Sequence, residues 1–315
     1  MQRRIMWRSW SRFEAEFELN RLKEDNVPLS NQWLNAHVTT NPEPDDIWLT
    51  TNGYDFTPTK AKRAVTWYAE SFVYLPNEYR NYQTNHKWFH RYHFNPNYAS
   101  QANSSLLHIA CWWQREKRTY DEIMKNKNPT HIFGMVQGKK PDEKLCPADW
   151  GFFRSKVVQA CRHRSFYYYG TKWTKDDPNY RGESYIDGHK HSPQKFNDAR
   201  RLLDKCKFVW CLENCHDQNY SLNYMTEKIF HGFLSGGVPI YLGAGNIEKM
   251  IHPGLFVDIR KFNYDINAVC NYCEKMPDSQ YKEMQEMIAV FLDTDALPYS
   301  CDYRFKELDQ KLSYL

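Results

Sequence analysis

The chain has 315 residues, of which 41% are hydrophobic and 16% aromatic. A chain of this length exceeds the size at which a single hydrophobic core usually keeps growing, so we expect two domains. The net charge is only +4, from 42 Lys and Arg against 38 Asp and Glu, and this mild, interspersed charge argues against a dedicated nucleic-acid-binding protein.

Targeting signals are not evident. The longest strongly apolar run, residues 287–292, is far shorter than the roughly 18 residues that a membrane-spanning helix needs. The first eight residues are basic but lack the apolar core of a secretory signal. These features predict a soluble or cytoplasmic chain with no membrane span, any membrane anchor lying outside it.

The cysteines and histidines do not form a metal motif. The nine cysteines leave an odd thiol, and their spacings fit no zinc ligand set, so we expect reduced thiols. His86 and His90 are four residues apart, but the Glu of a metalloprotease helix is missing. Asp293-Thr-Asp295 follows a helical pattern and is interpreted as a helix-end loop. We therefore predict no metal and no bound cofactor.

The first part of the chain contains short strand patterns. Residues 46–50 and 63–68 are apolar and β-branched runs separated by turn residues, and residues 105–112 resemble the start of a helix. A charged segment with a helix breaker, Lys125–Pro129, then interrupts the pattern. We place a domain boundary there, which gives an N-terminal α/β domain over residues 1–129.

From residue 130 onward, strand and helix patterns alternate. Residues 131–136 and 166–169 read as strands, and residues 154–162 and 194–204 as helices. This alternation is typical of an α/β domain with a parallel sheet. We assign residues 130–300 to a second α/β domain, and residues 301–315 to a C-terminal tail.

A strand-helix-strand unit in this second domain carries the strongest functional signal. Residues 207–212 form a strand-length apolar run, and a helix is predicted from Thr226 as its N-cap to the glycine pair at Gly236. The first turn of this helix holds Glu227 and Lys228. Because helix N-termini beyond the carboxyl ends of parallel strands bind anions, the pattern predicts a phosphate here, with Glu227 suited to a ribose diol. The alternative is that Glu227 only complements the helix dipole and that Lys228 is solvated.

The wider pattern is specific. Leu212-Glu-Asn214, a polar loop, Tyr224-Met-Thr-Glu-Lys228, and Gly236-Gly-Val-Pro-Ile-Tyr-Leu-Gly243 together resemble the donor-binding motif of the α1,3-fucosyltransferases, glycosyltransferase family 10. The resemblance implies that Asn214, Tyr224, Glu227 and Lys228 contact a nucleotide sugar. This sequence departs from the motif in a loop over residues 215–223 that is several residues longer than in bacterial members, and that begins with Cys215 in place of Ser or Thr.

A further basic residue fits the same resemblance. Arg154, at the start of a predicted helix, resembles the family's arginine that reaches the donor phosphates. Arginine binds phosphate through a fork of donors that lysine cannot reproduce. The alternative is a surface arginine beside Lys156.

The general base is expected in the other domain. The segment Lys62–Ser71 resembles the family segment in which a strand ends in Gly-Glu-Asn, and this places the catalytic base at Glu70. Ala69 and Ser71 flank the acid here. The alternative is that Glu70 is a solvated strand-end residue and that the acceptor site lies elsewhere.

The resemblance thus implies two Rossmann-like α/β domains facing a cleft, the GT-B architecture. In that architecture residues 1–129 would form the acceptor-side domain and residues 130–300 the domain that binds the nucleotide-sugar donor. It implies an inverting glycosyltransferase that moves L-fucose from GDP-fucose to a glycan hydroxyl without a metal cofactor. Two alternatives stay open: the same fold with another donor such as UDP-xylose, which would make the protein a xylosyltransferase, or a non-catalytic protein that binds sugar nucleotides or glycans.

Overall fold

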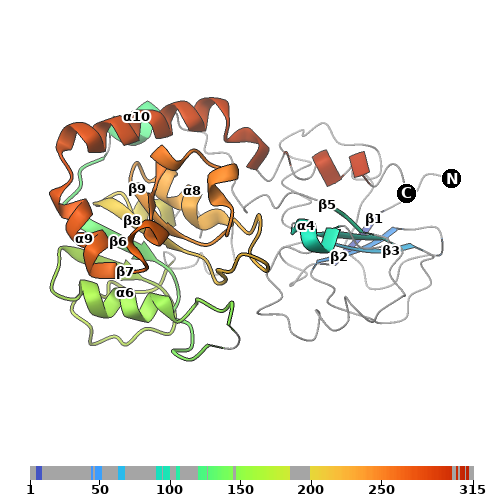
Figure 1. Cartoon of the computed structure of the whole chain (residues 1–315), viewed down its shortest axis with the longest axis horizontal. Coiled ribbons are helices and arrows are strands. Elements are labelled where there is room, and N and C mark those ends of the chain that lie inside the picture. The colour runs from blue at the N-terminus through green and yellow to red at the C-terminus, as the bar shows by residue number, and fades with distance from the viewer. Residues whose placement is uncertain are drawn as a thin grey trace.

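The structure is a computed structural model of the chain. It describes residues 5–8, 44, 47–51, 63–67, 90–93, 95–99, 104–106, 120–125, 127–144, 147–184, 199–299, 303, 306–308 and 310–311. Figure 1 shows two lobes, with the strands of residues 5–106 in one and those of residues 131–258 in the other.

The N-terminal lobe contains a five-stranded parallel sheet in the order β1-β2-β3-β4-β5. Its strands are β1 (Ile5–Arg8), β2 (Ile47–Thr51), β3 (Arg63–Trp67), β4 (His90–His93) and β5 (Ser104–Leu106), and the short helix α4 (Pro96–Ala99) follows β4. The predicted strands at residues 46–50 and 63–68 correspond to β2 and β3. The expected helix start at residue 105 is wrong, because Ser104–Leu106 pairs with β4 instead.

The C-terminal lobe contains a second five-stranded parallel sheet, in the order β10-β9-β8-β6-β7. The strands are β6 (His131–Val136), β7 (Phe166–Tyr169), β8 (Cys206–Leu212), β9 (Val238–Leu242) and β10 (Val257–Asp258). In chain order β7 lies on one side of β6 and β8 on the other, so the winding of the sheet reverses between β6 and β8. Ligands of open α/β sheets bind outside the carboxyl ends of the strands at such a reversal.

Helices flank this second sheet (Figure 1). They are α5 (Tyr120–Lys125), α6 (Phe153–Cys161), α8 (Glu227–Leu234), α9 (Ile266–Lys275) and α10 (Asp278–Thr294), with 3₁₀ turns at residues 247–249, 253–255, 259–262 and 297–299. The predicted helix at residues 194–204 is described only from residue 199, where a single helical turn precedes β8.

The core of the C-terminal lobe explains why β8 is apolar from Phe208 to Leu212. Phe208, Val209, Trp210, Cys211 and Leu212 are all at most 1% exposed, as expected for a central parallel strand covered on both faces. Helix α8 packs closely against β9. A Cβ atom at Gly232 would lie 2.8 Å from the Pro239 ring, so the absence of a side chain permits this approach.

Two buried thiols meet between α6 and α9. The Cys161 and Cys270 sulfurs are 3.6 Å apart, and both residues are fully buried. The six cysteines that the structure describes are free thiols.

Asp265 stabilises the start of α9 by accepting hydrogen bonds from the backbone N–H groups of Asn267 (2.8 Å) and Ala268 (3.1 Å).

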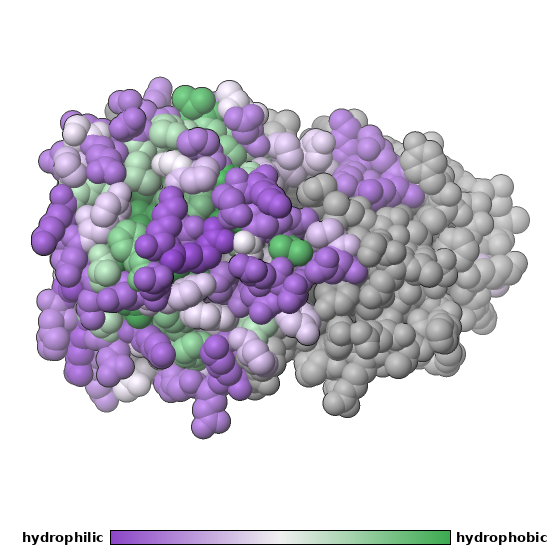
Figure 2. All heavy atoms as spheres, in the orientation of Figure 1, coloured by the Kyte–Doolittle hydropathy of each residue, from purple (hydrophilic) through white to green (hydrophobic). Residues whose placement is uncertain are grey.

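The surface over the described C-terminal lobe is mostly hydrophilic in the face that Figure 2 shows, with hydrophobic residues in small patches. Among the helices of the described residues, none is long and apolar enough to cross a bilayer.

Candidate functional site

Arg154 joins the ends of the two strands at which the sheet reverses. Its side chain is buried, and its Nη1 donates to the Gly138 carbonyl just after β6 at 3.0 Å. Its Nη2 donates to the Leu212 carbonyl at the end of β8 (3.0 Å) and to the Asn214 side-chain oxygen (2.6 Å). The alternative of a surface arginine is therefore wrong, and two of the predicted site residues, Arg154 and Asn214, are in direct contact.

Gln137 reinforces the same junction. This buried residue follows β6, and its amide donates to the Leu212 carbonyl (2.8 Å) and accepts from the Leu212 N–H (3.3 Å). The strand ends are thus fixed by two side chains rather than by the sheet ladder alone. Gln137 was not selected from the sequence, although its position immediately after a buried strand could have indicated a contact with a neighbouring strand end.

Glu213 organises the first turn of α8. It is fully buried, and its Oε1 accepts the Thr226 N–H at 2.7 Å, while its Oε2 accepts the Thr226 hydroxyl at 2.7 Å. Thr226 is the N-cap residue, as predicted, but its own side chain caps no N–H group of the helix. A carboxylate from the preceding strand therefore satisfies the donor at the helix start, which also complements the helix dipole.

The same carboxylate holds Lys228. The Lys228 ammonium lies 3.0 Å from Glu213 Oε2, 2.8 Å from the Thr226 hydroxyl oxygen and 3.4 Å from the Glu227 carboxylate. Lys228 and Glu227 are partly exposed, whereas Glu213 lies beneath them. The first turn of α8 thus presents a cation that is oriented by two carboxylates.

Burial and charge shift the pKa values of these acids in opposite directions. Burial raises the pKa of Glu213, and the Lys228 ammonium only partly offsets that effect. Burial also acts to raise the pKa of Glu227, but the charge of Lys228 and hydrogen bonds to the carboxylate outweigh it and bring the pKa to about 2. Glu227 is therefore ionised at neutral pH and available as an acceptor for hydroxyl groups.

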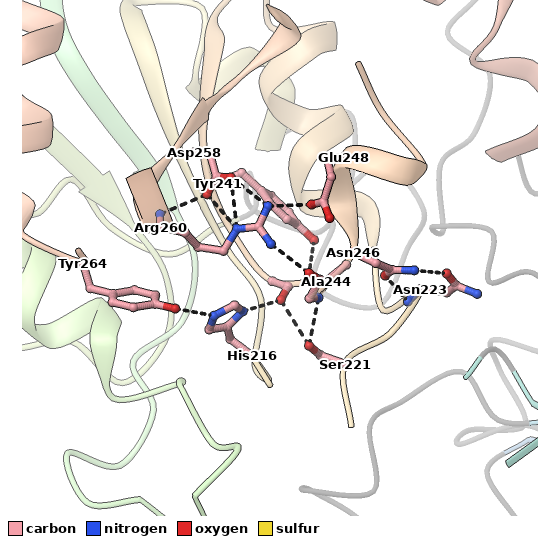
Figure 3. Close-up of polar contacts among 12 residues, drawn as sticks. His216, Ser221, Asn223, Tyr241, Ala244, Asn246, Glu248, Asp258, Arg260 and Tyr264 are labelled. Atoms are coloured by element: carbon pink, nitrogen blue, oxygen red, sulfur yellow. Dashed lines mark hydrogen bonds and ion pairs between the residues drawn. The ribbon is translucent and has the colours of Figure 1, made fainter. Parts of the chain in front are cut away.

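Asn214 and Tyr224 stand at the two ends of the 215–223 loop. The Asn214 carbonyl accepts from the Trp150 N–H at 3.0 Å, and Tyr224 is fully buried, its carbonyl accepting from the Tyr241 hydroxyl at 3.4 Å. Near the end of the loop, Asn223 and Asn246 exchange two hydrogen bonds of 2.8 Å, drawn in Figure 3. The loop is thereby attached to the turn that follows β9.

His216 has a defined tautomer within this loop. Its Nδ1 lies 2.7 Å from the Gly243 carbonyl oxygen, which can only accept, so Nδ1 carries the proton. Burial lowers the pKa of His216 and favours the neutral ring, whose Nε2 then accepts from the Tyr264 hydroxyl at 2.9 Å (Figure 3). This pair, 48 residues apart, was not selected from the sequence.

The predicted residues of the C-terminal lobe therefore form two adjoining groups. Arg154 contacts Asn214, while Lys228 contacts both Glu227 and the buried Glu213, the residue directly before Asn214. The fifth, Tyr224, lies buried at the far end of the loop. The predicted base, Glu70, lies outside the described residues. Within the described part of the chain, no group of three or more His, Cys, Asp or Glu side chains is arranged to hold a metal ion.

Comparison with known proteins identifies this region. Residues 182–286, which include Asn214, Tyr224, Glu227 and Lys228, match the family model "Glycosyltransferase family 10 (fucosyltransferase) C-term". The chain is 35% identical over 90 residues to an alpha-(1,4)-fucosyltransferase of Arabidopsis thaliana, and 36% identical over 69 residues to the alpha-(1,3)-fucosyltransferase FucT of Helicobacter pylori. These matches cover 29% and 22% of this chain, but only 21% and 14% of the two relatives.

The fold has a counterpart among solved structures. A crystal structure of an alpha1,3-fucosyltransferase superposes with a TM-score of 0.53 at 14% sequence identity, over 90% of this chain and 80% of that one. This likeness, together with the two parallel sheets, confirms the predicted fold of two Rossmann-like domains in the GT-B arrangement. By its motif and by residues 182–286, the chain is similar to glycosyltransferase family 10.

Proposed function

We propose that the protein is an inverting glycosyltransferase that transfers L-fucose from GDP-fucose to a hydroxyl group of a glycan. The observation that carries this proposal is the position of Arg154. Its guanidinium bridges the carboxyl ends of β6 and β8 and contacts Asn214, at the reversal of the sheet where nucleotides bind in such folds.

Departure of a nucleoside diphosphate requires stabilisation of developing negative charge. Arg154 supplies one positive charge, and Lys228 supplies a second in the first turn of α8, where the helix dipole adds to it. Glu227, ionised in this setting, is a suitable acceptor for the ribose hydroxyls. These groups together provide leaving-group stabilisation through cationic side chains of the chain itself.

Inversion at the sugar requires a base that removes a proton from the acceptor hydroxyl. We assign this role to Glu70, which would act from the N-terminal domain across the cleft on a donor held by the C-terminal domain. The choice of fucose as the transferred sugar is supported by the names of the relatives, which are fucosyltransferases. The chain spans about a fifth of the length of the Arabidopsis relative, so the match supports the donor-binding segment foremost.

The test is a donor comparison with the purified chain. GDP and UDP are titrated by calorimetry, and GDP-fucose and UDP-xylose are each incubated with a panel of oligosaccharides, with products identified by mass spectrometry. We expect tighter binding of GDP and transfer from GDP-fucose, with the anomeric configuration of the product opposite to that of the donor by NMR. Tighter binding of UDP would favour the xylosyltransferase alternative, and nucleotide binding without hydrolysis or transfer would favour a non-catalytic protein.

A further inference from the structure

A hydrogen bond connects the two lobes through the 215–223 loop. The Asn95 side-chain amide, in the turn after β4, donates to the backbone carbonyl of Asn219 at 2.6 Å. The Asn97 amide lies 3.5 Å from the same oxygen. Asn95 is fully buried, although this contact lies at the junction of two lobes. One carbonyl at the tip of the loop thus faces two amides of the N-terminal lobe.

The side chain of Asn95 is itself held in place. Its Oδ1 accepts the Asn97 N–H at 3.0 Å, as in an Asx turn at the start of α4, and this bond fixes which end of the amide faces Asn219. Because the amide oxygen is occupied by its own backbone, the NH₂ group is the end directed at the loop. The turn after β4 is therefore pre-arranged to donate a hydrogen bond to the opposite lobe.

The 215–223 loop is internally braced. The Asp217 carboxylate accepts the N–H groups of Asn219 (2.7 Å) and Tyr220 (3.1 Å), and the Ser221 hydroxyl oxygen accepts the Asp217 N–H (2.8 Å). The Ser221 oxygen also accepts from the Gly245 N–H at 3.1 Å, which ties the loop to the turn after β9. These bonds join the tip of the loop to the rest of the loop, so we expect the loop to move as one unit.

The residues that flank the loop at both ends are predicted to contact the nucleotide-sugar donor. Asn214 precedes it and contacts Arg154, and Tyr224 follows it, two residues before the N-cap of α8. The loop tip therefore connects the donor site to the carboxyl end of β4 in the N-terminal sheet, on the lobe to which we assign acceptor binding and the base. This connection can therefore fix the distance between the two lobes.

We propose that Asn95 is a positioning residue, which fixes the 215–223 loop against the N-terminal lobe and so sets the distance between the donor and acceptor sides of the cleft. This inference rests on the proposed function for its catalytic consequence, since transfer needs the base and the donor in one geometry. Its structural part, the attachment of the loop to the N-terminal lobe, does not depend on the reaction.

The variant that isolates this bond is Asn95→Asp. Aspartate keeps the size of the side chain and the oxygen that accepts a hydrogen bond from Asn97. It replaces the NH₂ group that faces the Asn219 carbonyl with a second oxygen, which cannot donate a hydrogen bond. We expect the kcat for fucose transfer to the glycan to fall about tenfold, because a hydrogen bond is replaced by repulsion between two oxygen atoms. The affinity for GDP and the slow hydrolysis of GDP-fucose without acceptor should stay within about twofold of the wild type, because the donor contacts are unchanged.

Asn219→Ala is the matched control. The bond uses the backbone carbonyl of Asn219, so removal of its side chain should leave transfer within about twofold of the wild type. Asn95→Ala is a milder second variant, which removes the donor without adding an acceptor, and circular dichroism establishes that each variant is folded. Wild-type transfer by both folded Asn95 variants would overturn the proposal, as would an equal loss of GDP affinity and transfer.

Hydrogen-deuterium exchange separates this inference from the proposed function. In Asn95→Asp, the amides of residues 217–221 should exchange faster than in the wild type, while Asn219→Ala should match the wild type. Unchanged exchange in Asn95→Asp would overturn the attachment even where the wild type transfers fucose. Faster exchange in a protein that transfers no sugar would instead retain the attachment and overturn the proposed function.

Discussion

The Lys228 ammonium lies 3.0 Å from the carboxylate of Glu213, and Glu213 is completely buried at the end of β8. The cation that the sequence assigns to a phosphate is therefore already bound to a carboxylate beneath it. A buried ion pair of this kind adds little net stability by itself, but loss of one partner leaves an uncompensated charge. Lys228 thus has two separable effects, one on the reaction and one on the folded state.

Replacement of Lys228 by alanine should reveal both effects. We expect the free energy of transition-state stabilisation to fall by roughly 2–4 kcal/mol, the scale for loss of one electrostatic stabiliser. The free energy of unfolding should also fall, because Glu213 loses its cation. The measurements are kcat/KM for transfer and urea denaturation of the same variant.

A double variant distinguishes the two effects. Glu213→Gln in the Lys228→Ala background removes the uncompensated charge, while the amide group can still accept from the Thr226 N–H. The double variant should therefore recover stability relative to Lys228→Ala without recovering transfer. Near-normal turnover in either variant would contradict the assignment of Lys228 to the leaving group.

Arg154→Lys tests the junction at the strand ends. A lysine cannot reproduce the bonds to the Gly138 and Leu212 carbonyls and to Asn214 at once, because its donors sit on a single nitrogen. We expect a loss of about 1–3 kcal/mol in the free energy of unfolding and weaker GDP binding by calorimetry. Arg162→Lys, at the exposed end of α6, is the control and should change neither. Unchanged GDP affinity in Arg154→Lys would remove Arg154 from the donor site.

Local patterns predicted the elements around the site well. The strand at residues 131–136 coincides with β6, and the α8 helix begins after Thr226 and ends before Gly236 as expected, because burial follows the helical and strand periods there. The strand β5 was missed because its pairing with β4 is a long-range interaction that outweighs a helical local pattern. The domain boundary at residue 129 stays a prediction.

The site itself was only partly predictable, because its contacts join residues far apart in the chain. The burial of Arg154 depends on Leu212, 58 residues away, and the tautomer of His216 depends on Gly243 and Tyr264. The motif drew attention to Asn214 and passed over Glu213 beside it. A carboxylate at the end of a buried strand needs a partner, and the structure supplies Lys228.

The pH dependence of stability should report His231 in α8. Burial lowers the pKa of His231 to about 3, although the neighbouring Glu227 acts to raise it. Since its ordinary pKa is 6.5, the unfolded chain binds a proton below that pH and the folded chain does not. The contribution of His231 is therefore present above pH 6.5 and is lost as the pH falls toward 3.

Comparison with His231→Gln isolates this contribution, because other groups titrate alike in both proteins. Between pH 6 and pH 4, the stability of the wild type relative to the variant should fall by up to about 1.4 kcal/mol per pH unit, the slope for one proton. The raised pKa of Glu213 favours the folded state at lower pH in both proteins, so this opposite contribution cancels in the difference. Urea denaturation at several pH values gives the difference, and parallel curves for the two proteins would contradict a neutral buried His231.

Transfer should not require a divalent cation. Arg154, Lys228 and the N-terminus of α8 supply the positive charge that a metal ion provides in other transferases. Activity measured after dialysis against EDTA should therefore stay within about twofold of the untreated enzyme. Complete loss with the chelator, restored by manganese, would show that a metal takes part.

The sharpest prediction concerns Glu70, because only the two-domain reaction scheme connects it with the donor motif more than 140 residues later in the sequence. Glu70→Gln keeps the size and hydrogen-bonding capacity of the side chain but removes its basicity. Acceptor transfer should fall by about 10²–10⁴, while the GDP dissociation constant stays within a few-fold. A general base must be ionised, so the acidic limb of the kcat/KM profile of the wild type should report the pKa of Glu70. Equal loss of nucleotide binding and turnover, or no loss of either, would place the base on another residue and remove the N-terminal domain from the opposite side of the cleft.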